Sequence, residues 1–132
     1  MSAGDSLVND GRKLLLDRGY NSSPTRSIPD DFAVGTGTNT PVKTDTNLQT
    51  QAGSDFNQEA NYPLIDIANI QMVVRGLLDE GDANANTLTE FAPKNTDSPD
   101  LIFARHVIQT GIIKNSSTRV IWIARYGLLS RS

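Results

Sequence analysis

His106 is the single histidine of the chain and the first candidate for catalysis. A Ser-His-Asp triad needs a histidine that a carboxylate orients and that faces a serine beside an oxyanion hole. The sequence contains no nucleophile-elbow motif of the kind that presents such a serine. Because His106 follows Arg105 inside a run of β-prone residues, we expect it on a sheet face or at an interface.

Two closely spaced glycines, Gly35 and Gly37, suggest a phosphate-binding loop. The dinucleotide fingerprint requires a third glycine at the position of Thr40, followed by an apolar helix. Here Pro41 comes next, no such helix follows, and the chain has no Gly-Lys-Ser or Gly-Lys-Thr sequence. We therefore interpret the two glycines as residues of a tight bend.

Acidic and amide residues between positions 79 and 86 resemble a calcium-binding loop in composition. Counted from Asp82, the sixth position of such a loop must be glycine and is Thr87, and the twelfth must be glutamate and is Pro93. We interpret this segment as a polar turn. Because the chain has no cysteine, thiolate ligands are also absent. The sequence therefore predicts no catalytic, cofactor-binding or metal-binding residues, and no cofactor.

The composition favours one soluble domain over residues 1–132, with a modest core from the 37% of residues that are hydrophobic. The net charge is −3, and the charged residues are scattered, whereas nucleic-acid binding needs clustered basic residues. No apolar run reaches the length of a membrane span, and no signal-peptide core is evident. We expect neither nucleic acid nor a membrane as a partner, and synthesis in a cytoplasm.

A short helix is predicted over residues 6–19, within an N-terminal segment 1–20. Asp5 or Ser6 could cap its start, and Gly19 stands where a left-handed C-cap residue is expected. One face of this helix carries Leu7, Gly11, Leu14, Leu15 and Arg18. Glycine in a helix costs about 1 kcal/mol relative to alanine, so this helix needs packing to persist.

A long polar segment follows a β-prone stretch at 32–34. From residue 38 to residue 61 the substantial apolar residues are Val42, Leu48 and Phe56. Structureless loops of this length are uncommon inside compact domains. Two explanations remain open: a disordered excursion, or an extended arm that becomes ordered against a neighbouring subunit.

The main β region is expected over residues 62–127. Alternating apolar residues predict strands at 70–78, 87–91 (ended by Pro93), 101–108 and 118–126. Polar turns are predicted at 79–86, 95–100 and 111–117. In the last strand both faces are apolar, so we expect both to be covered. The predicted fold is mainly β, a small antiparallel β-sandwich or barrel with one short N-terminal helix and a long extended loop.

Four segments of the chain form a recognisable series: residues 7–15, 34–48 (with Gly-Thr-Gly-Thr, a proline and Asp-Thr-x-Leu), 88–91 with 95–97, and 102–105. In this order they resemble segments of small virion proteins of tailed bacteriophages that are described as tail, collar, fibre-associated or head-decoration proteins. One departure is Ala92-Pro93, where relatives usually place a glycine after Thr-Glu-Phe. The resemblance covers most of the chain, and it implies a β-rich virion protein without enzymatic activity.

We therefore expect a structural accessory protein on the exterior of a phage particle, made in the bacterial cytoplasm. Its partners would be copies of itself, as a trimer or higher ring, and other virion proteins such as capsid, neck or tail proteins. Three roles remain open: a capsid decoration or cement protein, a collar or fibre-attachment adaptor of the tail, and a carbohydrate-binding module that contacts the host surface. The predicted interface residues are Thr38, Thr40, Pro41, Val42, Leu48, Phe56, Leu128 and Leu129.

Overall fold

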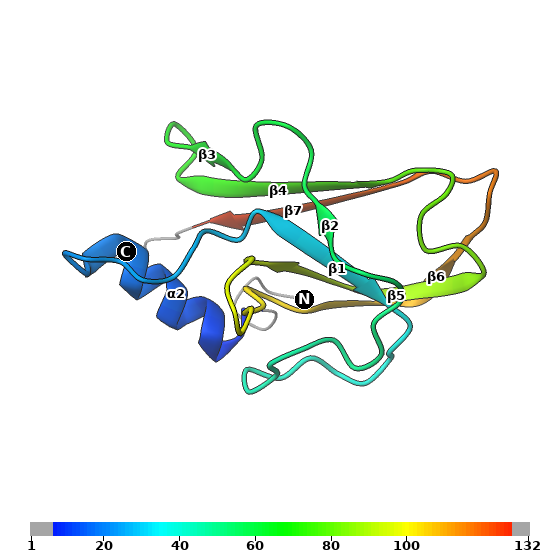
Figure 1. Cartoon of the computed structure of the whole chain (residues 1–132), viewed down its shortest axis with the longest axis horizontal. Coiled ribbons are helices and arrows are strands. Elements are labelled where there is room, and N and C mark those ends of the chain that lie inside the picture. The colour runs from blue at the N-terminus through cyan, green and yellow to red at the C-terminus, as the bar shows by residue number, and fades with distance from the viewer. Residues whose placement is uncertain (1–6, 128–132) are drawn as a thin grey trace.

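The computed structural model describes residues 7–127, which form a mainly β domain with one helix in that part of the chain (Figure 1). The elements are, in order, α2 (Asn9–Tyr20), β1 (Asp31–Gly35), β2 (Phe56–Asn57), β3 (Leu64–Asp66), β4 (Gln71–Leu78), β5 (Asn86–Lys94), β6 (His106–Lys114) and β7 (Val120–Gly127). Within residues 7–127, no helix combines the length and the apolar composition needed to cross a membrane.

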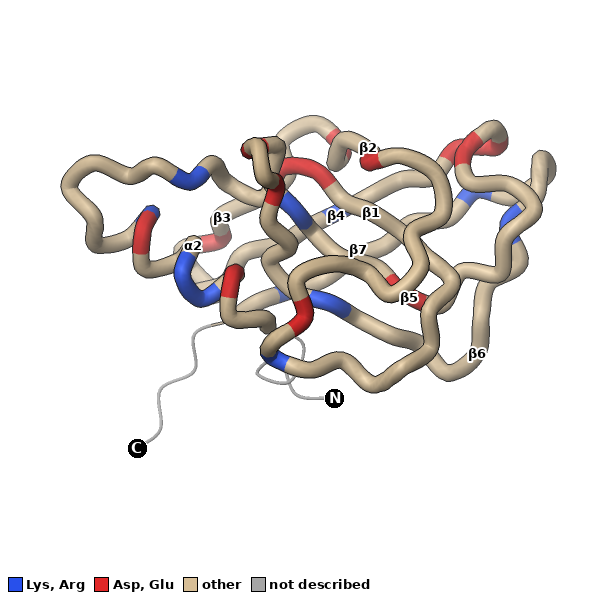
Figure 2. The backbone as a smooth tube through the Cα atoms, turned by 60° about the horizontal axis from the view of Figure 1, so that its bottom comes forward, with Lys and Arg blue, Asp and Glu red and all other residues tan. Residues whose placement is uncertain are grey.

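Two open antiparallel sheets pack face to face. Of the two predicted alternatives, the sandwich is confirmed, and the sheets do not close into a barrel. One sheet has the strand order β2-β1-β5-β6, and the other has the order β3-β4-β7. The chain passes from one sheet to the other between β2 and β3, between β4 and β5, and between β6 and β7. Basic and acidic residues are both scattered over the backbone (Figure 2).

Aromatic side chains fill the space between the sheets. The ring of Phe32 on β1 presses on β4 so closely that a Cβ atom added at Gly76 would lie 2.6 Å from its Cε1 atom. Phe91 on β5 stacks on Trp122 of β7, with ring centroids 5.2 Å apart and an interplanar angle of 9°. The core therefore joins β1 to β4 and β5 to β7, which fixes how the sheets lie on each other.

The last predicted strand is confirmed as β7, and its alternation places Val120 and Trp122 toward the core. Its opposite face is not covered as we expected. Ile121 and Ile123 are each 50% exposed on the outer face of the three-stranded sheet. That expectation is wrong, because these side chains keep about half of their surface exposed to solvent.

The helix is confirmed, with different ends. It begins after Val8, which makes no side-chain capping hydrogen bond, and the proposed caps Asp5 and Ser6 lie outside the described residues. Gly19 is inside the helix and has no left-handed conformation, since the helix continues to Tyr20 and its C-cap is Asn21. The predicted role of Gly19 is therefore wrong.

The strands after the long polar turn differ from the prediction in two places. β5 continues through Pro93, which is paired with Phe32 of β1. The ladder of β5 with β6 ends at Phe91, so the missing N–H of Pro93 removes no bond from that ladder. The stretch 101–105 is buried and irregular, attached by isolated bridges such as Lys94 to Ile102. The regular strand β6 starts only at His106, so Gly111 lies inside a strand and not in the predicted bend.

Segment 38–61 folds over the four-stranded sheet of its own subunit. The amide of Ala52 donates to the carbonyl of Val34 on β1 at 2.8 Å, and Phe56 and Asn57 form β2 beside β1. Leu48 and Ala52 are buried. The predicted extended arm is thus a packed loop in this structure.

Candidate assembly surface

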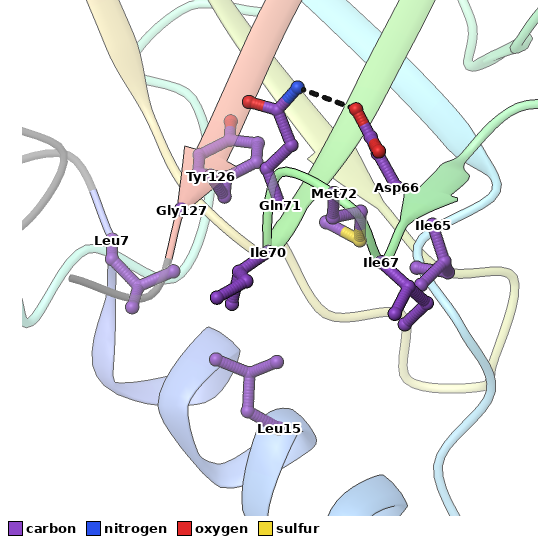
Figure 3. Close-up of a pocket in the computed structure, with 10 residues that line it drawn as sticks. All are labelled: Leu7, Leu15, Ile65, Asp66, Ile67, Ile70, Gln71, Met72, Tyr126 and Gly127. Atoms are coloured by element: carbon purple, nitrogen blue, oxygen red, sulfur yellow. Dashed lines mark hydrogen bonds between the residues drawn. The ribbon is translucent and has the colours of Figure 1, made fainter. Parts of the chain in front are cut away.

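An apolar recess lies at one end of the sandwich, between α2, the β3–β4 hairpin and the end of β7 (Figure 3). Its volume is about 440 Å³. Its apolar lining comes mainly from Leu7, Leu15, Ile65, Ile67, Ile70 and Met72. Figure 3 shows Leu15 rising from the helix toward Ile70, so the helix forms one wall and the hairpin the other.

The hairpin wall exposes large aliphatic side chains. Ile67 is 78% exposed, Ile70 is 60% exposed and Ile65 is 59% exposed. Single exposed aliphatic residues are ordinary on protein surfaces, whereas a contiguous group often marks an interaction site. Leu15 adds a fourth exposed aliphatic side chain from the opposite wall.

Polar contacts hold the tip of the hairpin in a strained conformation. The carboxylate of Asp66 accepts hydrogen bonds from the side chains of Asn69, at 2.8 Å, and Gln71, at 3.1 Å, and these bonds lower the pKa of Asp66. Ile70 has φ = 53°, a left-handed conformation that is rare for a β-branched residue. Strain of this kind costs about 1–3 kcal/mol and often accompanies functional sites. The strained turn thus holds the isoleucines at the recess.

The helix wall is fixed by a close contact with the stretch before β6. A Cβ atom added at Gly11 would lie 1.9 Å from the carbonyl oxygen of Phe103, so only glycine fits there. Leu14 packs with Phe103 and Ala104, and the next residue, Leu15, is left facing the recess. The sequence therefore positions Leu15 through Gly11 and Leu14.

Behind the recess, Tyr126 connects its lining to His106. The Tyr126 hydroxyl and Nε2 of His106 are hydrogen-bonded at 2.5 Å, and the His106 ring stacks on Phe91. Burial lowers the pKa of His106 to about 4 and raises the pKa of Tyr126. His106 lies on a sheet face, as predicted, and is a neutral structural partner of Tyr126 near pH 7.

A polar site lies beneath the long loop that covers the four-stranded sheet. Glu90 and Arg105 are both fully buried and form an ion pair with Nε of Arg105 2.9 Å from Oε1 of Glu90. The Glu90 carboxylate also accepts from the backbone amides of Gly37, Gln49 and Thr50 at 2.7–2.9 Å. Each carboxylate oxygen is thus satisfied by the loop that covers it.

Arg105 completes the attachment of that loop. Its guanidinium donates to the backbone carbonyl and side chain of Asn39 and pairs with Asp45 at 3.2 Å. A Cβ atom at Gly37 would lie 2.5 Å from the Glu90 carboxylate, so this glycine permits close approach of backbone to a buried charge. Gly35 is the last residue of β1 and Gly37 follows it beside Glu90, so the two glycines do not form the predicted tight bend. The amide of Gly37 already donates to the Glu90 carboxylate.

The predicted interface residues separate into three groups. Thr38, Thr40 and Val42 are exposed and Pro41 is half-buried, and all four lie on the loop that Glu90 and Arg105 hold. Leu48 is buried, and Phe56 packs on Phe32 with ring centroids 5.5 Å apart, so these two side chains serve their own core and do not face a partner. Leu128 and Leu129 lie outside the described residues.

The isoleucines at 65, 67 and 70 were missed as surface residues, because an apolar run next to a strand resembles core. The signal in the sequence is the turn pair Ala68-Asn69, which interrupts that run.

Within residues 7–127, no group of three or more histidine or acidic side chains is arranged to hold a metal ion. Comparison of the chain with protein-family models, with curated proteins and with solved structures found no match.

Proposed function

We propose that this protein is a structural accessory protein of a tailed-bacteriophage virion, without enzymatic activity, that attaches to the particle exterior through the apolar recess. The observation that carries the proposal is the group of exposed isoleucines on the β3–β4 hairpin, at 59–78% exposure. The ordered resemblance of the sequence to small virion proteins supports the phage assignment. The recess supplies the contact that such a role requires.

The chemistry of the recess indicates what it takes. Asp66, the charged group in its lining, already accepts hydrogen bonds from Asn69 and Gln71. The remaining lining is aliphatic apart from Tyr126, whose hydroxyl is bonded to His106. Burial of aliphatic surface contributes roughly 25 cal/mol per Å². The partner that fits is a neighbouring virion protein that presents aliphatic side chains, and not a charged peptide or a phosphate.

A carbohydrate-binding role has less support. Sugar-binding platforms expose aromatic faces, whereas Trp122 stacks against Phe91 between the sheets. Tyr20 is the aromatic residue with the largest exposure, at 88%, and it stands alone at the end of α2. No aromatic platform is therefore assembled in the described part of the chain.

Imaging of particles assembled without this protein tests the proposal. We expect a defined density on the particle exterior to disappear and to return when the purified protein is added back. Copy number per particle, measured by quantitative mass spectrometry, separates the two variants of the role. Hundreds of copies indicate capsid decoration, and a small number indicates a neck or tail adaptor. Particles that are unchanged in mass and image would contradict the proposal.

A further inference from the structure

The free edges of the two sheets differ in how they are protected against pairing. An edge strand presents unpaired backbone N–H and C=O groups, and proteins usually blunt such edges with short strands, bulges, charges or proline. In residues 7–127 the edge strands are β2 and β6 in one sheet and β3 and β7 in the other. β2 has two residues and β3 has three, so neither offers a long template.

β6 is long but irregular. Its ladder with β5 shifts register between Leu88 and Glu90, so that Ile112 and Val107 pair with residues only two positions apart. An irregularity of this kind bends a strand and spoils its outer hydrogen-bonding row. The edge of β6 is therefore blunted.

β7 lacks all of these protections except a single charge. Its eight residues form eight consecutive pairs with β4, from Val120 opposite Leu78 to Gly127 opposite Gln71, with no bulge. The strand contains no proline and one charged residue, Arg125. Its outward side chains Ile121 and Ile123 are half exposed. It is the one long, regular and apolar edge among the described strands.

We propose that β7 pairs antiparallel with β7 of a second copy of this chain, which joins the two three-stranded sheets into one sheet of six strands. The sequence of β7 is self-complementary in the register centred on Ile123. Ile121 then lies opposite Arg125 of the second copy, so the two arginines never face each other. On the inner face, the large Trp122 lies opposite the small Ala124 of the second copy.

This pairing is isologous, which means that both copies use the same strand and that the contact closes at two subunits. In this register residues 120–126 of the two strands pair, which gives about six to eight backbone hydrogen bonds, because alternate residue pairs exchange two each. The inference goes beyond the proposed virion role, because it concerns the protein in solution.

Charge substitutions at Ile121 test the register. In the proposed pair Ile121→Lys faces Arg125 of the second copy, whereas Ile121→Glu faces the same arginine with opposite charge. Both substitutions remove the same half-exposed side chain, so each is the control of the other. We expect sedimentation velocity to show a dimer of the wild-type protein. The Kd should rise about tenfold for Ile121→Lys relative to Ile121→Glu, because two symmetry-related pairs change sign.

A cross-link locates the centre of the pairing. The chain has no cysteine, so Ile123→Cys introduces a single thiol that faces its own symmetry mate. We expect oxidation to give a covalent dimer for Ile123→Cys and not for Ile113→Cys, whose position on β6 is 70% exposed. A wild-type monomer at every concentration, open-ended polymers, equal effects of the two Ile121 variants, or cross-linking through Ile113→Cys would overturn the proposal. None of these outcomes bears on whether particles carry the protein.

Discussion

The two sides of the sandwich hold their loops in opposite ways. Over the four-stranded sheet, a polar loop is attached by the fully buried pair Glu90 and Arg105, which bond the backbone amide of Gly37 and the backbone carbonyl of Asn39. Beside α2, an apolar hairpin is held at its tip by Asp66 and leaves its isoleucines exposed. From polarity alone, the polar loop would be the segment expected to be available to a partner. In the structure the polar loop is anchored to its own sheet, and the apolar hairpin is available to a partner.

The largest effect is expected from breaking the attachment of the polar loop. Glu90→Gln leaves the buried Arg105 without its nearest charge and weakens three backbone hydrogen bonds. Removing one partner of a buried ion pair typically costs about 3–5 kcal/mol. Urea unfolding should show a loss of this size, and limited proteolysis should cut the loop 38–50 faster.

The matched control is Asp45→Asn, because Asp45 pairs with the same arginine but keeps 17% of its side chain exposed. We expect it to lose about 1.5–3 kcal/mol of unfolding free energy, the range for a hydrogen bond to a charged group. If Glu90→Gln were as mild as Asp45→Asn, the loop would not depend on the buried pair.

The second effect is a pH dependence that arises at the back of the recess. Burial lowers the pKa of His106 from 6.5 to about 4, so the unfolded chain binds a proton that the folded protein does not. His106 therefore contributes stability above pH 6.5, and this contribution is lost as the pH falls toward 4. A shift of this size corresponds to about 3 kcal/mol at most.

Thermal melts between pH 7 and pH 4 measure this dependence. The variant His106→Gln, which can still hydrogen-bond the Tyr126 hydroxyl, should show a flatter profile over that range. Carboxylates with lowered pKa, such as Asp66 and Asp97, titrate at lower pH and are shared by both proteins. Parallel profiles for the two proteins would exclude His106 as the group responsible.

Two glycines of α2 should respond in opposite directions to the same substitution. Gly11→Ala places a methyl group 1.9 Å from the carbonyl of Phe103, and overpacking of this kind costs about 1–3 kcal/mol. Gly19 has no atom within 4 Å of an added Cβ and lies inside the helix, so Gly19→Ala should gain about 0.5–1 kcal/mol. Chemical denaturation of both variants tests the pair. A lower free energy of unfolding for Gly19→Ala would instead support the left-handed C-cap that the sequence alone suggests for Gly19.

Local periodicity explains what could be predicted from the sequence. The strands β4 and β7 are continuous runs of mostly apolar and β-branched residues, bounded by polar turns, so their existence follows from the residues themselves. The stretch 101–105 is equally apolar but irregular, because long-range bonds such as the Phe103 amide to the Pro93 carbonyl fix it. No local pattern encodes such a bond.

The two candidate sites depend even more on tertiary structure. Glu90 and Arg105 are fifteen residues apart, and nothing in either neighbourhood marks them as a buried pair. Ile65, Ile67 and Ile70 look like the start of a core strand, and only the turn between β3 and β4 brings them to the surface. The sequence predicts the sandwich, whereas the distinction between anchored and exposed segments arises from packing.

A substitution in the β3–β4 hairpin should have the smallest effect on stability and the largest effect on assembly. Ile67 is 78% exposed, so Ile67→Ser should change the free energy of unfolding by no more than about 0.5 kcal/mol. It removes the most exposed aliphatic side chain of the recess and should reduce rebinding to particles that lack the protein. Ile113→Ser, at 70% exposure on β6, is the control and should rebind normally. Full rebinding of Ile67→Ser would mean that the exposed hairpin is not the contact. The loop anchored by Glu90 would then be the better candidate, because Thr38, Thr40 and Val42 are exposed on it.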